Sequence, residues 1–444
     1  MGQTTNKEQQ TTKIIVLDDD PTGSQTVHSC LLLMDWDIAT LRQGLADPAP
    51  IFFILTNTRA LTPNNAATVT RQVCQNLKIA LVAEGIKDFL VVSRSDSTLR
   101  GHYPVETDII AAELGPFDAH FLVPAFFEGG RITRNSVHYL IIDGVPTPVQ
   151  ETEFARDSVF SYHHSYLPDY VAEKTQGKIP GTAVERFLLE DIRNGSLSRL
   201  KNLTENTCVA VDGETQEDLD NFAADVLATA REGKRFLFRS AASILTSLAK
   251  LGKQPVVPDD MGRYKKTANP GVVLVGSHVQ KTTQQLEQLL TAPGVMGIKV
   301  DVLRLREKPN QRDILLEEIL QKLYRTYQDN KTSVVYTSRE ELTFHNIQER
   351  LDFGGIVSSF LMEVVKGLPE GISFLISKGG ITSNDVLSKG LGLKSVGLLG
   401  QILPGCSIVR TPKDHPQFPD LPVVLFPGNV GDVEGLLTVY HRLM

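Results

Sequence analysis

The chain has 444 residues, more than one compact core usually holds, so two domains are expected. Its 22% charged and 41% hydrophobic residues exclude a disordered protein. The formal net charge of −7 argues against a nucleic-acid-binding protein, because such proteins usually carry a basic excess or a basic stripe. The longest apolar runs have about five or six residues, whereas a membrane-spanning helix needs about 20.

The cysteines and the first residues of the chain both favour a cytoplasmic protein. The four cysteines lie far apart and form no CxxC pair, a pattern typical of reduced thiols. Residues 1–12 are polar and lack the apolar run of a signal peptide. We therefore expect a soluble cytoplasmic protein whose partners include neither a membrane nor a nucleic acid.

The first half of the chain repeats one unit, in which a short apolar run precedes a polar turn and a helical pattern. The predicted strands are residues 13–17, 51–55, 89–93, 120–123 and 208–211. Helical patterns cover residues 64–81, 103–114 and 216–231. Strands that alternate with helices of this length predict βαβ units and a parallel sheet.

Two stretches interrupt this pattern. Residues 130–181 have weak periodicity, so we expect a long excursion from the sheet with a hairpin near residues 144–146. Residues 252–270 contain three prolines and two glycines, which suits an exposed linker. The pattern then restarts, with predicted strands at 272–275, 334–336, 374–376 and 423–426, a helix over 281–290 and a final helix.

The expected fold class is therefore α/β, with two domains that each hold a mainly parallel sheet flanked by helices. The N-terminal domain is predicted over residues 12–251 and the C-terminal domain over residues 271–444, joined by the linker at 252–270. In open α/β sheets, ligands bind beyond the carboxyl ends of the strands, so the turns at these ends are the candidate sites.

The candidate turns of the first half are rich in acidic and arginine residues: Asp18, Asp19, Asp20, Arg59, Arg94, Asp96 and Arg100. Arginine binds carboxylates and phosphates through its planar fork of N–H groups. Aspartate accepts hydrogen bonds from sugar hydroxyls or removes a proton from one. Taken singly, the turn at 18–23 is equally a solvated acidic turn, and residues 97–101 are equally a helix cap with a surface arginine.

The candidate turns of the second half are rich in glycine, serine and threonine, a composition that lets backbone N–H groups approach a phosphate. Taken singly, each such turn is more often only a tight turn. The chain has no GxxxxGK[ST] motif and no GxGxxG between a strand and a helix. A P-loop is therefore excluded, and a dinucleotide-dependent dehydrogenase is disfavoured.

Together these motifs resemble the four-carbon acid sugar kinase family, whose members join an N-terminal sugar-acid-binding domain to a C-terminal nucleotide-binding domain. The first half fits at residues 19–23 (Asp-Asp-Pro-Thr-Gly), 94–101 (Arg-Ser-Asp-Ser-Thr-Leu-Arg-Gly) and 124–157. The second half fits more briefly at residues 276–277, 378–382 and 428–432. The sequence departs from the family at Arg94, where lysine is usual, and at His278 and Asn429, where cysteine and glycine are favoured.

The resemblance implies ATP-dependent phosphorylation of the terminal hydroxyl of a small, about four-carbon sugar acid such as erythronate, threonate or a 3-oxo-tetronate. It implies a phosphotransferase with an alcohol acceptor that uses ATP and Mg²⁺, although no motif names the ligands of the metal. The alternative is a non-catalytic sensor of a sugar acid or a nucleotide on the same fold. A homodimer is the default assembly.

The resemblance also implies roles for individual residues. The catalytic candidates are Asp19, Asp20 and Asp96, with Asp19 or Asp20 orienting or deprotonating the attacking hydroxyl. The substrate-binding candidates are Arg59, Arg94, Ser97, Arg100, Gly101, Arg131 and Asn135. The nucleotide-binding candidates are Gly276, Ser277, Lys378, Gly379, Gly380, Thr382, Gly428 and Asn429.

Overall fold

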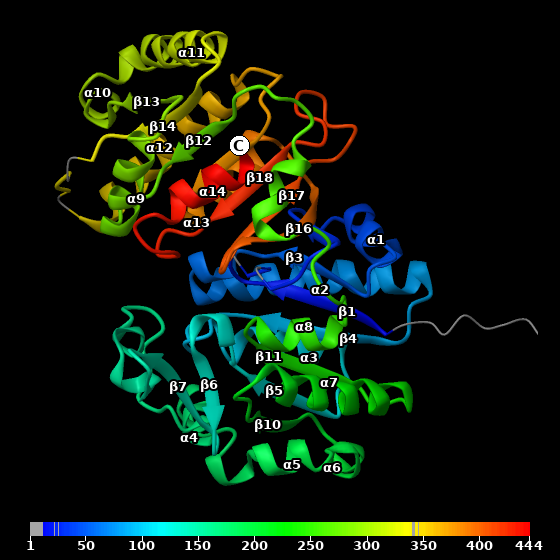
Figure 1. The fold of residues 1–444 in the computed structure, drawn as a ribbon. Coiled ribbons are helices and arrows are strands. Elements are labelled where there is room, and N and C mark those ends of the chain that lie inside the picture. The colour runs from blue at the N-terminus through cyan, green and yellow to red at the C-terminus, as the bar shows by residue number, and fades with distance from the viewer. Residues whose placement is uncertain (1–11, 22, 25, 340–341, 345) are drawn as a thin grey trace, which may run out of the picture. The chain divides into compact units, whose positions relative to one another are not determined.

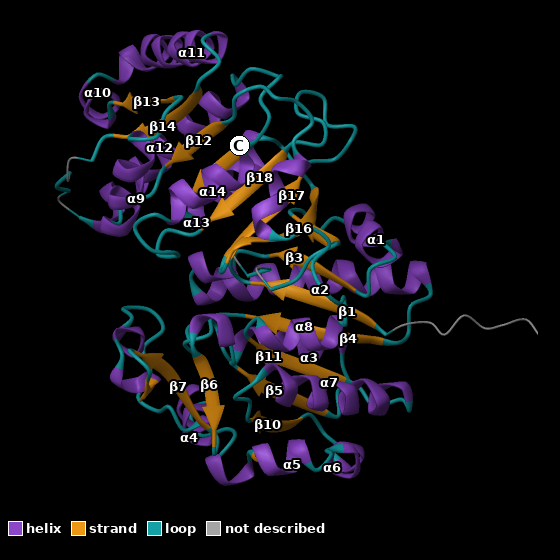
Figure 2. Cartoon of the chain, viewed as in Figure 1, coloured by secondary structure: helices purple, strands orange, loops and turns teal. Residues whose placement is uncertain are grey.

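The computed structural model describes residues 12–21, 23–24, 26–339, 342–344 and 346–444. The chain divides into two compact units, of which unit 1 comprises residues 1–26 and 30–252 and unit 2 comprises residues 27–29 and 253–444. Figure 1 and Figure 2 show that helices flank the strands in each unit. This confirms the predicted α/β class.

The sheet of unit 1 is parallel throughout. Its strand order is β2–β3–β1–β4–β11–β5–β10–β9. The strands are β1 (Lys13–Asp18), β2 (Cys30–Leu33), β3 (Ile51–Leu55), β4 (Phe89–Arg94), β5 (Ala119–Val123), β9 (Glu185–Phe187), β10 (Thr207–Val211) and β11 (Phe236–Ser240). The register places Asp18 opposite Leu55 and Arg94, and Arg94 opposite Ser240. The polar residues that end these strands therefore lie at one edge of the sheet.

Helices cover both faces of this sheet because their apolar sides pack on its buried strands. The helices are α1 (Ile38–Ala46), α2 (Pro63–Glu84), α3 (Val105–Leu114), α4 (Leu167–Lys174), α5 (Leu189–Arg193), α6 (Leu197–Asn202), α7 (Gln216–Arg231) and α8 (Ser243–Ala249). The longest, α2, begins where Thr62 caps it and Pro63 takes its first turn, and it ends at Gly85 in the left-handed conformation. The predicted helices at 64–81, 103–114 and 216–231 correspond to α2, α3 and α7.

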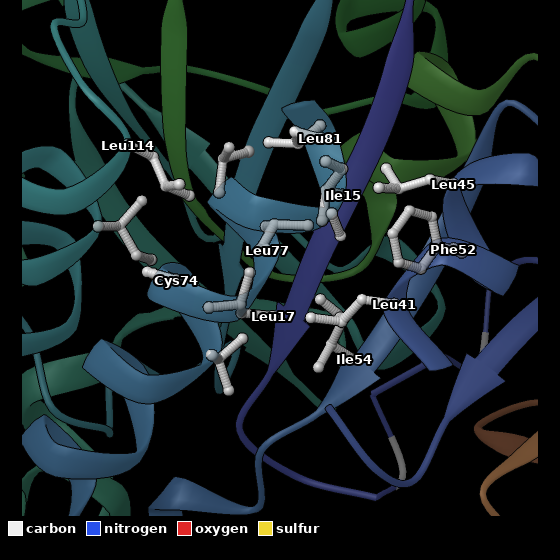
Figure 3. Close-up of a cluster of buried hydrophobic side chains, with 14 of the residues drawn as sticks. Ile15, Leu17, Leu41, Leu45, Phe52, Ile54, Cys74, Leu77, Leu81 and Leu114 are labelled. Atoms are coloured by element: carbon white, nitrogen blue, oxygen red, sulfur yellow. The ribbon is translucent and has the colours of Figure 1, made fainter. Parts of the chain in front are cut away.

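One core cluster of unit 1 lies between the sheet and helices α1, α2 and α3, as Figure 3 shows. Its strand residues include Ile15 and Phe52, and α2 contributes Leu77, all three of which are fully buried. The single tryptophan of the chain, Trp36, packs against this cluster. This core fixes the strands whose ends carry the acidic and arginine residues.

The excursion predicted over residues 130–181 contains a small antiparallel sheet. Its strands are β6 (Arg131–Arg134), β7 (Val137–Ile142) and β8 (Val145–Pro148) in the order β6–β7–β8. The predicted hairpin is confirmed, because Ile142 pairs with Val145 across a turn in which Asp143 and Gly144 both have positive φ. The short helices η2 (Phe127–Gly129), η3 (Val149–Glu151), η4 (Glu153–Arg156) and η5 (Gly181–Ala183) complete this region.

The sheet of unit 2 is mixed. Its strand order is β13–β14–β12–β15–β18–β17–β16, in which β16–β17 and β17–β18 are antiparallel and the other pairs are parallel. The strands are β12 (Val272–Val275), β13 (Val295–Val300), β14 (Thr332–Thr337), β15 (Leu375–Lys378), β16 (Ser395–Leu403), β17 (Cys406–Arg410) and β18 (Pro422–Phe426). Val275, Lys378 and Phe426 are level with one another in the register.

The helices of unit 2 are α9 (Gln280–Leu290), α10 (Val302–Glu307), α11 (Arg312–Gln328), α12 (Ile347–Lys366), α13 (Gly380–Asp385) and α14 (Gly435–Leu443), with shorter turns at η6 (Pro258–Tyr264), η7 (Pro309–Gln311) and η8 (Val386–Gly390). Within the predicted linker, η6 places Met261 fully buried in the core of unit 2. The segment 27–29 also belongs to unit 2, where the Ser29 N–H donates to the Leu398 carbonyl of β16 at 2.7 Å. None of the helices in the described part of the chain is long and apolar enough to cross a membrane.

Candidate functional site

Acidic and arginine residues gather in unit 1 where β1, β3 and β4 end. Asp19 and Asp20 follow β1, Arg59 lies in η1 (Thr58–Ala60) after β3, and Asp96 follows β4. Because the strands are parallel and in register, three turns that are far apart in the sequence meet at one place. Thr22, which belongs to the first motif, lies outside the described residues.

Arg59 joins three carboxylates. Its guanidinium contacts both oxygens of Asp19, with Nε 3.2 Å from Oδ2, and its Nη1 lies 3.3 Å from Asp20 Oδ2 and 3.9 Å from Asp96 Oδ1. Burial opposes the charge of Arg59, but the three carboxylates outweigh it and raise its pKa well above the usual range. Arg59 therefore stays charged and fixes the relative positions of the acidic residues.

Asp96 is the second centre of the cluster. It accepts hydrogen bonds from the Thr98 backbone N–H at 3.1 Å and from the Thr98 hydroxyl, and Arg100 grips it with Nε at 2.9 Å from Oδ2 and Nη2 at 3.3 Å from Oδ1. Burial acts to raise the pKa of Asp96, but Arg59 and Arg100 hold it well below its usual range. Asp96 is thus an ionised acceptor with a fixed orientation.

Arg100 and Arg131 border this cluster. Arg100 also lies 3.6 Å from Asp157 Oδ2 and stacks over the ring of Phe154. Arg131, at the start of β6, donates through Nη1 to the Gly129 carbonyl, and its buried Nε has no hydrogen-bond partner among the described residues. Burial lowers the pKa of Arg131, while Asp96 acts to raise it. The binding of a ligand anion by these two arginines stays a prediction.

Arg94 and Asp18 form a buried pair beneath the acidic turn. Arg94 Nη1 lies 3.3 Å from Asp18 Oδ1, and the two side chains are only 5% and 1% exposed. Gly23 passes so close that a Cβ on it would lie 2.1 Å from both Asp18 oxygens. Arg94, expected to contact the substrate, thus points to Asp18. Its role in substrate binding stays a prediction, and its observed contact supports the turn.

The buried carboxyl of Asp18 predicts that the stability of unit 1 depends on pH. Burial, partly offset by Arg94, raises its pKa from the ordinary 3.8 to about 7, so between these values the folded state binds more protons than the unfolded state. The contribution of Asp18 to the free energy of unfolding should be fully present below pH 4. It should fall by on the order of 1–4 kcal/mol as the pH rises through 7.

Urea unfolding followed by tryptophan fluorescence measures this, because Trp36 reports unit 1 alone. In the Asp18→Asn variant the fall between pH 4 and 7 should be smaller by the same amount. If the free energy of unfolding falls equally with pH in the variant and in the parent protein, the assignment to Asp18 is contradicted.

The remaining substrate-binding candidates divide between the cluster and the hairpin. Ser97 is buried, and its carbonyl contacts His138 Nε2 at 2.7 Å. Gly101 has φ of 125°, and a Cβ on it would lie 2.4 Å from both Ser95 Oγ and Arg239 Nη2, so only glycine fits. Asn135 is exposed at the β6–β7 turn with its N–H on Asp212, and the structure does not bring it to the cluster.

Two further residues of this edge were not among the predicted site residues. Ser95 Oγ lies 2.5 Å from Asp19 Oδ2, and Arg239, at the end of β11, donates through Nη1 to Glu106 Oε2 at 2.9 Å and Ser93 Oγ at 3.1 Å. The signal for Arg239 is the sequence FLFRS, where a charged residue ends an apolar run, the same pattern that singled out Arg94.

In unit 2 the predicted glycine turns meet one another. The N–H groups of Gly276 and Ser277 point to the Lys378 carbonyl at 3.3 and 3.4 Å, and the Gly379 N–H donates to the Phe426 carbonyl at 2.8 Å. A Cβ on Gly276 would lie 2.3 Å from Thr382 Oγ1. Where these two turns meet, Gly276 therefore leaves no space for a larger side chain.

The third turn, after β18, is hydrogen-bonded to the side chain of Lys378. This fully buried side chain donates to the carbonyls of Pro427 at 2.6 Å and Gly428 at 3.2 Å, and its Nζ lies 3.9 Å from the centre of the Phe426 ring. Burial lowers the pKa of Lys378 to about 7. Thr282 Oγ1 also donates to the Gly428 carbonyl, at 3.1 Å. Lys378 thus positions a turn that was predicted to contact the nucleotide.

Gly380 and Asn429 are the outer members of these turns. Gly380 begins α13, and a Cβ on it would meet nothing within 4 Å, while the Asn429 carbonyl accepts from Lys281 Nζ at 3.4 Å. Arg339, absent from the predicted site residues, follows β14 and donates through Nη1 to the Ser277 carbonyl. Its buried Nε and Nη2 have no hydrogen-bond partner within the described ranges. A phosphate oxygen would satisfy such donors.

Comparisons with known proteins match both units. A family model described as a sugar-binding N-terminal domain matches residues 14–248, and one described as a nucleotide-binding C-terminal domain matches residues 272–436. A solved structure from Salmonella typhimurium LT2 shares the fold with a TM-score of 0.72 at 18% identity, over 97% of this chain and 98% of that chain.

Two curated relatives are similar over part of their length. The chain is 28% identical over 308 residues to D-erythronate kinase of Heliobacterium modesticaldum, which covers 65% of this chain and 63% of that protein. It is 30% identical over 161 residues to D-threonate kinase of Bordetella bronchiseptica, which covers 34% of this chain and 37% of that protein. The chain therefore spans less than two thirds of either relative.

The matched ranges contain the sites built above. The first includes the acidic and arginine cluster around Arg59, and the second includes the glycine turns around Lys378. The resemblance indicated by the motifs is thereby confirmed. The chain belongs to the family that joins a sugar-binding N-terminal domain to a nucleotide-binding C-terminal domain, the architecture of the four-carbon acid sugar kinases.

Proposed function

We propose that the protein is an ATP-dependent phosphotransferase that acts on the terminal hydroxyl of a small sugar acid such as erythronate, threonate or a 3-oxo-tetronate. The observation that carries the proposal is the set of Asp19, Asp20 and Asp96 around Arg59, bordered by Arg100 and Arg131. Carboxylates suit the hydroxyls of such a substrate, and arginines suit its carboxylate. The names of the two curated relatives support the same substrate class.

Phosphoryl transfer depends on positioning and on charge stabilisation more than on covalent chemistry. Asp96, held ionised by two arginines, accepts hydrogen bonds from substrate hydroxyls. Asp20 orients the attacking hydroxyl and accepts its proton, because its side chain is 26% exposed whereas that of Asp19 is 2% exposed. Arg100 and Arg131 bind the substrate carboxylate. Arg59 fixes the carboxylates relative to one another.

The turns of unit 2 fit the phosphates of ATP. Gly276, Gly379 and Gly428 let the three turns pack closely against one another, and Arg339, whose Nε and Nη2 have no hydrogen-bond partner among the described residues, adds positive charge beside Ser277. Bound ATP would supply the transferred phosphoryl group. The described residues contain no group of three or more His, Cys, Asp or Glu that could hold a metal ion. The use of Mg²⁺ stays a prediction without assigned ligands.

A cytoplasmic location is part of the proposal, since all four cysteines are free and buried. The homodimer and the absence of a nucleic-acid partner stay predictions.

An ATP-coupled screen of short sugar acids with Mg²⁺ tests the proposal. We expect ADP release that depends on a four-carbon acid, and a product whose mass shows one added phosphate on the terminal hydroxyl. Binding of these acids without ADP release would contradict the kinase and favour a sensor. NAD found bound to the purified protein would overturn the proposal.

A further inference from the structure

A small cavity lies beside the acidic cluster of unit 1. It measures about 20 Å³ and is lined by residues that include Ser95, Asp96, Leu99, Tyr170, Arg239 and Ser240. A cavity that holds one water needs roughly 10–15 Å³, so this one admits about one oxygen atom of a ligand or one water. Its walls come from strand ends and turns of the edge that carries the cluster, together with Tyr170 of α4.

Two of the lining residues present polar atoms without partners. Arg239 is 8% exposed, and its Nη2 has no hydrogen-bond partner among the described residues. Ser240 is 3% exposed, and its Oγ is likewise unpaired within the described part of the chain. Buried polar groups are nearly always satisfied, because an unmade hydrogen bond costs free energy. An oxygen atom in the cavity would satisfy both.

The hydrogen bonds of Nη1 fix the orientation of the Arg239 guanidinium. Nη1 donates to Glu106 Oε2 at 2.9 Å and to Ser93 Oγ at 3.1 Å, and Glu106 in turn accepts from the Thr58 hydroxyl at 2.6 Å. The carboxylate of Glu106 thus occupies one nitrogen of the guanidinium and leaves Nη2 to a ligand.

The lining decides which kind of oxygen fits. Arg239 supplies an N–H donor, whereas Asp96 supplies a carboxylate that can only accept while it is ionised. A carboxylate oxygen would be repelled by Asp96. A keto oxygen would accept from Arg239 but could give nothing to an acceptor. A hydroxyl does both, since it accepts one hydrogen bond and donates another.

We propose that this cavity binds a chain hydroxyl of the substrate, one that is not phosphorylated, and that Arg239 selects hydroxy acids over deoxy and keto acids at that carbon. The inference rests on the proposed function and narrows its substrate class to tetronates. A cavity that binds the C3 hydroxyl favours tetronates over 3-oxo-tetronates, which lack that hydroxyl. The oxygen that the cavity accepts can come from the substrate or from water, and the experiment below distinguishes the two.

Isothermal titration calorimetry without ATP compares D-erythronate, its 2-deoxy and 3-deoxy analogues and the corresponding 3-oxo acid. The parent protein should bind D-erythronate about 10- to 100-fold more tightly than one of the deoxy acids. In the Arg239→Gln variant, the affinity for D-erythronate should fall to the level of the weakly bound deoxy acid. The affinity of the variant for that deoxy acid should be close to the affinity of the parent protein for it. Equal loss for every acid would mean that Arg239 is only structural or holds only water, and would overturn the proposal.

A second variant guards against misfolding, since Arg239→Gln leaves Glu106 without its buried partner. Ser240→Ala removes an oxygen that has no partner in the described structure and should keep the fold, with a selective loss of roughly 2- to 10-fold for D-erythronate. No selective loss in this variant would also count against the cavity. Trp36 fluorescence verifies the fold of each variant.

Arg235→Gln is the matched control. Arg235 precedes the same strand at its opposite end, donates to the Leu114 carbonyl at 2.8 Å and stacks on Phe89 and Phe117. Its loss should leave the selectivity between hydroxy and deoxy acids unchanged. A selective binding of D-erythronate without phosphorylation would contradict the proposed kinase while supporting the cavity, so the two failures are distinguishable.

Discussion

Replacing Asp20 with asparagine should lower kcat/KM for the sugar acid by about 10²- to 10⁴-fold, the usual contribution of a general base. Asp19 cannot readily serve, because Arg59 and Ser95 occupy its oxygens and its side chain is 2% exposed. Asp96 is held ionised by Arg59 and Arg100, and a carboxylate with so low a pKa is a poor base. Asparagine keeps the shape of Asp20 but cannot accept the proton, and it also lacks the negative charge that faces Arg59. Steady-state kinetics with the coupled assay measure the effect.

Asp143→Asn is the matched control for Asp20→Asn. Asp143 lies in the β7–β8 turn with φ of 50°, a conformation that asparagine tolerates. The kcat/KM of the Asp143→Asn variant should equal that of the parent protein. If Asp20→Asn retains activity within about threefold, far less than the loss of a base causes, Asp20 is not the base.

Replacing Lys378 with methionine should weaken ATP binding by about 10- to 100-fold. The buried Nζ of Lys378 donates to the Pro427 and Gly428 carbonyls, and a thioether has no donor with which to hold them. With two carbonyls unpaired, the turn after β18 should move away from its position beside Ser277. Calorimetric titration of ATP into the full chain measures the affinity.

Lys366→Met provides the control for Lys378→Met. Lys366 is exposed at the last turn of α12, so its loss should not change the affinity for ATP. Far-UV circular dichroism establishes that both variants are folded. An unchanged affinity in folded Lys378→Met protein would show that the Gly428 turn does not contribute to nucleotide binding.

The strands with continuous apolar runs were predictable from the sequence, whereas several others were not. The runs at β1, β3 and β12 are short, apolar and bounded by turn residues, and the structure confirms them. The strand β16 was missed because Gly397 and Gly400 interrupt its pattern, and a Cβ on Gly400 would lie 2.1 Å from the Gln254 side chain. In such a strand, tertiary packing overrides local preference.

The residue types of the candidate site were predictable, but their pairing was not. The turns after β1 and β4 indicated acidic and arginine residues, yet the choice of Asp18 as the partner of Arg94 depends on strand register. Asn135 was expected near the substrate because of its motif, but the β6–β7 hairpin carries it to Asp212. Arg239 was missed because its neighbours in space come from residues 93–106, far away in the sequence.

The segment 27–29 has a consequence for how such a protein can be divided. The chain enters unit 2 for three residues between β1 and β2, returns to unit 1, and enters unit 2 again at Lys253. A fragment that begins at Lys253 would therefore lack the N–H of Ser29 that satisfies the Leu398 carbonyl. No single cleavage separates the units as complete modules. If one unit were exchanged between genes by an end-to-end fusion at Lys253, residues 27–29 would stay with the wrong unit. We therefore expect the two units to be inherited together.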